Sequence, residues 1–245
     1  MILAVIPNYS QEPRLAQLAG LVADASRARM LCYLLGGDFA SAGELAKSAS
    51  VGAATASGHL AKLLDAGMVV CEQRGRHRYY RLADSDVAHA LEALAMVAER
   101  GTHTRTWSSP ARARLRFARC CYGHIAGQFG VAVLQGMLEQ RWLEKAGEAS
   151  FAVTDQGSQA LAQMGLDGAA WQRKTAVAGR GVAYGCLDWS ERRDHMAGKL
   201  ASALLDHFLA RGWLKRQPGD RALEFTPVGH AALGSWIRLP LNKPA

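Results

Sequence analysis

The chain has 245 residues, of which 49% are hydrophobic and 20% are charged, and this composition excludes a disordered protein. No apolar run approaches the roughly 20 residues that a membrane-spanning helix needs. The N-terminal stretch MILAVIPNYS lacks the basic flank of a secretory signal. We therefore expect a cytoplasmic protein without membrane contact. The net charge of +8 favours a polyanionic partner such as a nucleic acid.

The positive charge is unevenly distributed along the chain. Residues 1–101 carry equal numbers of basic and acidic side chains, and most of the excess lies in residues 102–145. If the first segment binds nucleic acid, its affinity must come from local placement of basic side chains, because its overall charge is balanced.

Apolar residues recur at helical spacing over residues 15–22 and again over residues 30–35. Residues 41–44, Ser-Ala-Gly-Glu, have the pattern of a capping box, which predicts the start of a third helix. After a turn at residues 50–52, a fourth helix is expected to run to about residue 66, where a glycine follows.

A β-hairpin is predicted next, with strands over residues 69–73 and 77–82 and a turn at residues 74–76. Ser85 is expected to start a last helix of this segment, which ends near Gly101. The order helix, helix, turn, helix, hairpin, helix is that of a winged helix-turn-helix, in which the helix after the turn enters the major groove of DNA. Two cysteines of this segment, Cys32 and Cys71, are expected at core positions.

Three stretches, DASRARMLCYLL, GELAKSASVGAATASGHLAKLLDAGMVV and RGRHRYYRL, resemble the ArsR-type transcriptional regulators. The resemblance covers about residues 14–100 and implies a homodimeric repressor that binds a near-palindromic operator in double-stranded DNA. It also implies that the terminal helices of this domain form the dimer seam. The Cys-x-Cys pair of metal-sensing members is absent, because residues 39–43 read Phe-Ala-Ser-Ala-Gly. Asp86 and His89 have no matching downstream pair, so the usual metal sites of the family are not carried over.

The predicted recognition helix and wing offer the groups that DNA binding requires. Short polar side chains near a helix N-terminus can approach bases and phosphates closely, and arginines in the hairpin can contact phosphates. The alternative is that these arginines are ordinary solvated strand residues. The residues expected to contact DNA are Thr55, Ser57, Gly58, His59 and Lys62 in the helix and Arg74, Arg76, His77, Arg78 and Tyr80 in the hairpin.

The second half of the chain contains an internal repeat, because residues 124–143 align with residues 195–214. The repeat predicts two copies of one unit, each a long helix, a strand and a short helix, packed as a pseudo-twofold pair. The expected fold class is mainly α with small β-hairpins, with a winged-helix-like C-terminal part. The expected domains are 1–101 for DNA binding and dimerisation, 102–118 as a basic linker, and 119–245 for effector sensing, with repeats at 119–167 and 184–240.

Two segments at equivalent places of the repeats, residues 119–124 and 184–195, are candidates for an effector site. Three interpretations remain open, besides a purely structural role. The first is a zinc or other soft-metal site formed by Cys121 (or Cys120), His124, Cys186 and His195. The second is a pocket for an organic effector, formed by Tyr122, Tyr184, Trp189, Trp213, His124, His195, Asp188 and Arg192. The third is thiol sensing at Cys120 or Cys121 beside Arg119.

The spacing of Cys121 and His124 would place both on one face of a helix. In the second repeat, Asp188, Glu191 and His195 could form an acid/base group, which keeps an enzyme as the rival function class. Ser190 is equally suited to cap a helix there. Because phosphate-binding glycine loops and nucleophile elbows are absent from the sequence, we expect a regulator rather than an enzyme.

The basic residues Arg112, Arg114, Arg116 and Arg119 follow Trp107 at short spacing. They are expected either to add a phosphate contact near the operator or to form a solvated helix face that pairs with acidic residues of the sensor. The overall expectation is a homodimeric repressor that an effector, bound in the C-terminal domain, releases from its operator.

Overall fold

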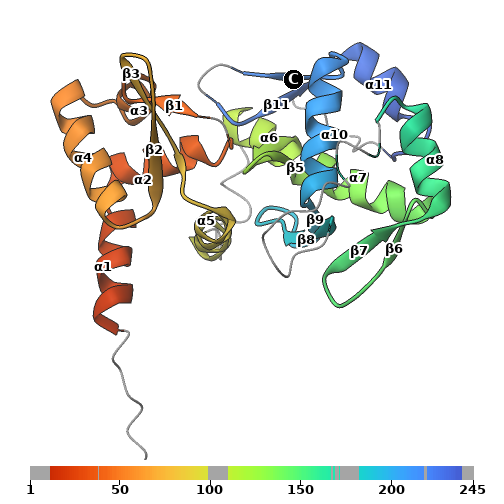
Figure 1. Cartoon of the computed structure of the whole chain (residues 1–245), viewed down its shortest axis with the longest axis horizontal. Coiled ribbons are helices and arrows are strands. Elements are labelled where there is room, and N and C mark those ends of the chain that lie inside the picture. Colours follow the sequence, from red (N-terminus) through yellow and green to blue (C-terminus); the bar gives the residue numbers. More distant parts are fainter. Residues whose placement is uncertain are drawn as a thin grey trace, which may run out of the picture. The chain divides into compact units, whose positions relative to one another are not determined.

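The computed structural model describes residues 12–37, 39–98, 110–166, 168, 171, 182–217 and 220–238. The chain divides into two compact units, one formed by residues 1–34 and 39–84 and the other by residues 35–38 and 85–245. Figure 1 shows the elements of both units and labels most of them. The N-terminal stretch MILAVIPNYS, Gly101, Trp107 and the expected linker up to residue 109 lie outside the described residues.

The first unit consists of helices and a small antiparallel sheet. Its helices are α1 (Glu12–Val22), α2 (Ala25–Leu34), α3 (Ala42–Ala49) and α4 (Ala53–Asp65). Its strands are β1 (Ala40–Ser41), β2 (Val69–Arg74) and β3 (His77–Leu82), in the order β1-β3-β2. The helices and the hairpin have the predicted order, and this confirms the winged helix-turn-helix. The strand β1, which pairs with Tyr79 and Tyr80 of β3, was not predicted from the sequence.

Side chains at the helix ends explain why these helices begin where they do. Ser41 caps α3, its hydroxyl accepts from the Glu44 N–H, and the Glu44 carboxylate accepts from the Ser41 N–H at 2.7 Å. The Asp24 carboxylate accepts from the N–H groups of Ser26 and Arg27 at the start of α2. The Arg27 guanidinium donates to two carbonyls near the end of α1. The caps fix the first turns of α2 and α3, and Arg27 connects α2 to the end of α1.

Several apolar and sulfur-containing side chains of the first unit lie at the surface. The expectation that Cys32 and Cys71 fill the core is wrong, because both are exposed. Helix α1 projects from the rest of this unit (Figure 1), and it exposes Leu15 and Leu18, by 68% and 38%. Its outward apolar side therefore lacks a partner within the described part of this unit.

The second unit begins with α5 (Ser85–Ala98) and α6 (Pro110–Phe117). Two stretches with the same succession of elements follow, each a hairpin, a long helix, a second hairpin and a short helix. The first consists of β4 (Arg119–Cys121), β5 (His124–Ala126), α7 (Gly127–Glu139), β6 (Leu143–Lys145), β7 (Ser150–Val153) and α8 (Asp155–Gln163). The second consists of β8 (Ala183–Leu187), β9 (Asp194–Ala197), α10 (Lys199–Ala210), β10 (Leu214–Arg216), β11 (Leu223–Phe225) and α11 (Pro227–Leu233).

The two stretches also share details of hydrogen bonding. Thr154 caps α8 and Thr226 caps α11, and each hydroxyl accepts from the N–H of the glycine three residues later. A Cβ added to either glycine, Gly157 or Gly229, would lie 2.1 or 2.3 Å from the carbonyl oxygen of a tryptophan. The sequence predicted one strand after each long helix, whereas the structure has two. It also has a hairpin before each long helix.

A single hydrophobic core joins both stretches of the second unit. Phe129 of α7 and Phe208 of α10 are fully buried, and the Phe129 ring lies 4.7 Å from that of Phe225 on β11. Strands β6, β7, β8 and β9 form one four-stranded sheet, while β4-β5 and β10-β11 are separate ribbons. Among the described residues, no helix has the length and apolar character needed to span a bilayer.

Candidate functional site

Helix α4 exposes four of the five residues that were expected to contact DNA from this helix. Thr55, Ser57, Gly58 and Lys62 are exposed on it. His59 differs, because its side chain is only 15% exposed and its Nδ1 lies 3.3 Å from the Arg27 Nη1. The imidazole therefore contacts α2 and positions the recognition helix, while the four exposed residues form the outer face.

The hairpin β2-β3 presents basic side chains at its end. Arg76, His77 and Arg78 are exposed. Arg74 is also exposed, but it forms an ion pair with Glu72 at 3.2 Å, and its guanidinium carbon lies 4.6 Å from the centre of the Phe39 ring. Tyr80 does not match the expectation. It is 5% exposed, because its side chain faces the core side of the sheet, and it is therefore not placed to contact DNA.

In the second unit, the structure brings together the four residues that were considered for a metal site. Cys121, His124, Cys186 and His195, here called the Cys/His cluster, offer ligand atoms that all lie within 4.8 Å of one another. All four side chains are buried. Cys120 lies outside the cluster, since its thiol donates to the Gly36 carbonyl oxygen at 2.9 Å.

The Cys/His cluster is built on two β-hairpins. Cys121 of β4 pairs directly with His124 of β5, and Cys186 of β8 pairs with His195 of β9. Because side chains of directly opposed residues lie on the same face of a ribbon, each hairpin supplies one thiol and one imidazole. The expectation that Cys121 and His124 share a helix face is wrong, since both lie on strands.

The first hairpin is closed by a two-residue turn. Tyr122 and Gly123 have φ values of 45° and 87°, so both central residues adopt the left-handed conformation typical of a type I′ turn. Gly123 accepts this conformation without steric cost. The turn sets the register that places Cys121 opposite His124.

The two imidazoles of the Cys/His cluster are in direct contact. The Nε2 atoms of His124 and His195 lie 3.1 Å apart, so one must donate a proton and the other must accept it. Burial alone would lower the pKa of His195, but Asp188 and Cys121 raise it to about 9. Burial lowers the pKa of His124. We therefore assign the charge to His195 and the accepting nitrogen to His124.

The Cys121 thiol of the cluster is not an activated nucleophile in this structure. Contact with Cys186 and burial raise the pKa of the Cys121 thiol to about 12. Reactive cysteines have lowered pKa values and partial exposure, because the thiolate is the nucleophile. The environment of Cys121 therefore does not favour the thiol-sensing interpretation.

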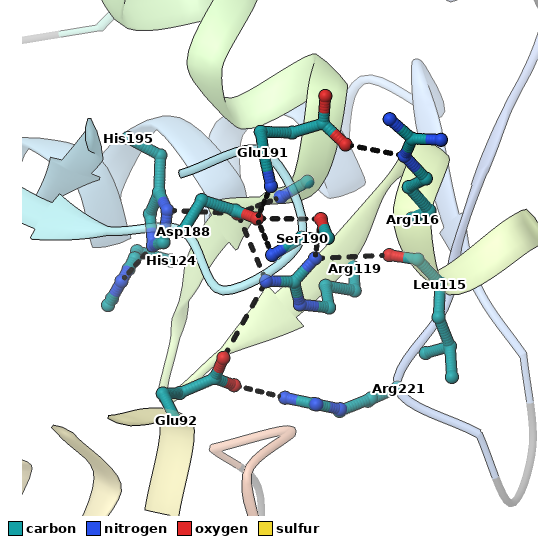
Figure 2. Close-up of polar contacts among 11 residues, drawn as sticks. Glu92, Leu115, Arg116, Arg119, His124, Asp188, Ser190, Glu191, His195 and Arg221 are labelled. Atoms are coloured by element: carbon teal, nitrogen blue, oxygen red, sulfur yellow. Dashed lines mark hydrogen bonds and ion pairs between the residues drawn. The ribbon is translucent and has the colours of Figure 1, made fainter. Parts of the chain in front are cut away.

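Asp188 lies behind His195 and is completely buried. Its Oδ1 accepts from the N–H and hydroxyl of Ser190 and from the Glu191 N–H, and its Oδ2 accepts from the Gly127 N–H and from Arg119 (Figure 2). Burial would raise the pKa of Asp188, but Arg119 and His195 hold it below its ordinary value. Residues 188–193 form a turn rather than a helix, so the expected capping role of Ser190 in a helix is wrong.

Further buried charges extend from Asp188. Arg119 lies 3.0 Å from Asp188 and 3.6 Å from Glu92, and Arg221 pairs with the other oxygen of Glu92. Sequence reasoning missed Glu92 and Arg221. The available signal was the position of Glu92 beside Leu91 on the apolar side of a predicted helix, where an acidic residue requires a buried partner.

A cavity of about 980 Å³ borders the Cys/His cluster. Four residues of the expected effector set line it, namely Cys121, Tyr122, His124 and Tyr184. The remaining members of that set, Cys186, Asp188, Trp189, Arg192, His195 and Trp213, are not part of its described lining. Trp189 instead packs against the Arg119 guanidinium, whose carbon lies 4.7 Å from the ring centre. The organic-effector pocket thus has a different lining from the one the sequence suggested.

Comparison with known proteins identifies the first unit. Residues 24–70 match the family described as bacterial regulatory protein, arsR family. The chain is 40% identical over 229 residues to the HTH-type transcriptional regulator YdfF of Bacillus subtilis strain 168, a match that covers 94% of this chain and 99% of the relative. It is 39% identical over 87 residues to the HTH-type transcriptional regulator CmtR of Mycobacterium bovis, which covers 36% of this chain and 73% of CmtR.

Two solved structures of similar proteins each cover less than half of this chain. The solution structure of a homodimeric winged helix-turn-helix domain from Mycobacterium bovis covers 43% of this chain and 97% of its own, with 24% identity and a TM-score of 0.37. The structure of the cadmium metal-sensor CMTR of Mycobacterium tuberculosis covers 34% of this chain and 85% of its own, with 37% identity and a TM-score of 0.30. The matches to the family and to its full-length relative show that the chain belongs to the arsR family and is a transcriptional regulator with a winged helix-turn-helix DNA-binding unit.

Proposed function

We propose that the protein acts in the cytoplasm as a homodimeric repressor that binds an operator in double-stranded DNA through α4 and the hairpin β2-β3. The exposed face of α4, with Thr55, Ser57 and Lys62, supports this role. So do the exposed basic residues Arg76 and Arg78 at the hairpin end, since arginines there can bind phosphates and fix the position of α4 on the duplex.

We propose that α1 and α5 form the dimer seam. Leu15 and Leu18 are exposed on α1, and Leu94 and Val97 are each 50% exposed on α5. Exposed apolar side chains on a helix mark an interaction surface when several lie on the same element. A symmetric dimer would present two recognition helices to a two-fold symmetric operator.

We propose that the second unit, built from two copies of one repeat, senses a soft metal ion such as Zn²⁺ at the Cys/His cluster. The observation that carries this proposal is the convergence of two thiols and two imidazoles within 4.8 Å in a buried place. Two thiolates and two neutral imidazoles are a common donor set for Zn²⁺ and related soft ions. The other polar group at this place, Asp188, is already bound by other residues, so the four donors fit a metal without it.

We further propose that the protein is a regulator without enzymatic activity. An enzyme would use Asp188, Glu191 and His195 as its acid/base group. Asp188 and His195 are completely buried, and Glu191 forms an ion pair with Arg116 at 2.7 Å. These three side chains are therefore occupied by structural ion pairs, and none of them lines the cavity of about 980 Å³ as described.

The experiment is a metal and DNA titration of the purified full-length chain. One Zn²⁺ or Cd²⁺ per chain is expected after dialysis, and none in the double variant Cys121→Ser, Cys186→Ser. The matched control is Cys32→Ser, Cys71→Ser, which changes two exposed cysteines of the first unit. DNA fragments selected by the protein from random duplexes should lose affinity when Zn²⁺ or Cd²⁺ is added, by the 5- to 150-fold that allosteric coupling commonly gives. Equal metal content in the cluster variant would contradict the proposed metal site.

A further inference from the structure

We propose that Asp188 is a positioning residue for the metal ligand His195, and that the buried ion chain Asp188–Arg119–Glu92 links the Cys/His cluster to α5. This inference rests on the proposed function, because it concerns the regulation of the same metal site. Figure 2 shows the residues involved.

The two hairpins that carry the cluster differ in one respect. Two residues separate Cys121 from His124, whereas residues 187–194 separate Cys186 from His195. The longer loop of the second hairpin contains Asp188. The additional residues therefore supply a carboxylate beside one histidine of the cluster, although both hairpins present the same pair of donors.

The position of Asp188 is that of an outer partner of a metal ligand. Its Oδ2 lies 3.1 Å from Nδ1 of His195, while Nε2 of the same ring faces His124 and the centre of the cluster. Ligating histidines commonly pair their second nitrogen with a carboxylate, which fixes the orientation of the ring. The Nδ1 atom of His195 is buried, and its contact with Asp188 is within the distance of an ion pair.

Asp188 is itself held rigidly. Ser190 and Glu191 bind one carboxylate oxygen from within the loop, and Gly127 binds the other from the start of α7. A carboxylate with this many donors cannot follow a moving imidazole freely. Movement of His195 is therefore transmitted to the partners of Asp188, or is resisted by them.

The ion chain continues from Asp188 to α5. Nη2 of Arg119 lies 3.0 Å from Oδ2 of Asp188 and 3.6 Å from Oε2 of Glu92. Arg119 is 0% exposed and Glu92 is 3% exposed, and Arg221 pairs with Glu92 from its other side. Charges that are this deeply buried interact strongly, and an arrangement that loses one partner is costly. A shift at Asp188 therefore changes the balance of contacts at Glu92.

Helix α5 is suited to transmit such a shift. It starts at Ser85, shortly after β3 ends at Leu82, so it continues the chain directly from the hairpin that we propose to contact DNA. The same helix exposes Leu94 and Val97, which we propose for the dimer seam. A change in the position or stability of α5 would alter the distance between the two recognition helices α4 of a dimer, each of which binds one half-site of the operator.

The first arm of the test measures metal binding directly by the absorption of Co²⁺ in the full-length chain, followed by competition with Zn²⁺. Asp188→Asn should weaken metal binding 10- to 100-fold, because the outer carboxylate is lost while the four ligands remain. Asp194→Asn is the matched control, since this exposed aspartate is the first residue of β9 and directly precedes His195. Equal affinity of Asp188→Asn and the wild type would overturn the positioning role.

A second variant covers the case in which Asp188→Asn does not fold. Ser190→Ala removes one donor, the hydroxyl, from the Asp188 carboxylate and keeps the backbone N–H donor, the charge and the pairing with Arg119. It should change the Co²⁺ absorption spectrum and weaken metal binding by a smaller factor than Asp188→Asn. An unchanged spectrum and affinity would then overturn the positioning role.

The second arm measures coupling. Glu92→Gln should weaken metal binding less than Asp188→Asn does, and it should bring the ratio of operator affinities without and with Zn²⁺ close to one. Glu139→Gln, an exposed residue at the end of α7, is the control and should keep the wild-type ratio. A wild-type ratio in Glu92→Gln overturns the link to α5. Absence of metal binding in the wild type would instead overturn the proposed function, so the two failures are distinguishable.

Discussion

At the scale of single residues, the exposure of each side chain in the hairpin β2-β3 determines whether it can contact DNA. Arg76 and Arg78 are exposed, whereas Arg74 is paired with Glu72 and Tyr80 is buried. The sequence could place all four in a wing, but strand alternation and local pairing decide which side chains face solvent. The first two are therefore the better candidates for phosphate contacts.

The substitution Arg76→Ala with Arg78→Ala should weaken DNA binding for all duplex sequences. Each lost phosphate contact should lower the slope of log K against log salt by about 1. Fluorescence anisotropy over a salt series measures this slope. Lys145→Ala, an exposed basic residue of the second unit, should leave it unchanged. Identical slopes for the wild type and the arginine variant would contradict the role of the hairpin.

Ser41 provides a test of local stability. Ser41→Ala removes the side-chain acceptor of the capping box at α3 and should lower the free energy of unfolding by about 1 kcal/mol. Urea denaturation measures the loss. Ser48→Ala, a hydroxyl inside the same helix, should change it by less than about 0.5 kcal/mol. Equal effects of both substitutions would show that the cap is not the source of the stability.

At the scale of elements, each short helix of the second unit starts against a tryptophan carbonyl. A Cβ at Gly157 would lie 2.1 Å from the Trp142 oxygen, which is far inside van der Waals contact. Gly157→Ala should therefore destabilise the chain by about 1–3 kcal/mol, as overpacking commonly does. Ser158→Ala, the next residue of α8, serves as the control in thermal unfolding. Equal stability of Gly157→Ala and the wild type would contradict the close approach.

The short strands β4 and β5 show why residue spacing alone did not predict the local structure around Cys121 and His124. The three-residue spacing of Cys121 and His124 predicted one helix face, yet these residues lie on a hairpin whose strands have three residues each. Strands this short carry too little periodicity to be distinguished from a turn or a helix start. Their pairing is stabilised by contacts such as that of the Tyr122 N–H with the Leu35 carbonyl, which is remote in sequence.

At the scale of the whole molecule, the proposed dimer is open to a direct test. Leu94→Glu places a charge on the exposed apolar side of α5 and should weaken dimerisation at least tenfold, because the charge would be buried at the seam. Sedimentation equilibrium measures the dimer dissociation constant. Val228→Glu, at a residue of α11 that is 61% exposed, should leave the dimer intact. A dimer that tolerates Leu94→Glu would place the seam elsewhere.

The sequence by itself determined the winged helix-turn-helix and its membership in the arsR family. Caps such as Ser41 with Glu44, apolar spacing and the hairpin turn act within a few residues, so they can be read locally. It also named the four members of the Cys/His cluster, because the repeat placed two Cys- and His-bearing segments at equivalent positions.

Only the tertiary structure decided that those four residues meet, and that Cys121 rather than Cys120 joins them. Adjacent residues of a strand face opposite sides, and which side faces the second hairpin depends on packing far along the chain. The same holds for the ion chain, since Glu92, Arg119 and Asp188 come from three separate segments. These three side chains are buried away from water, so each charge is stable only when it is paired with an opposite charge from another segment.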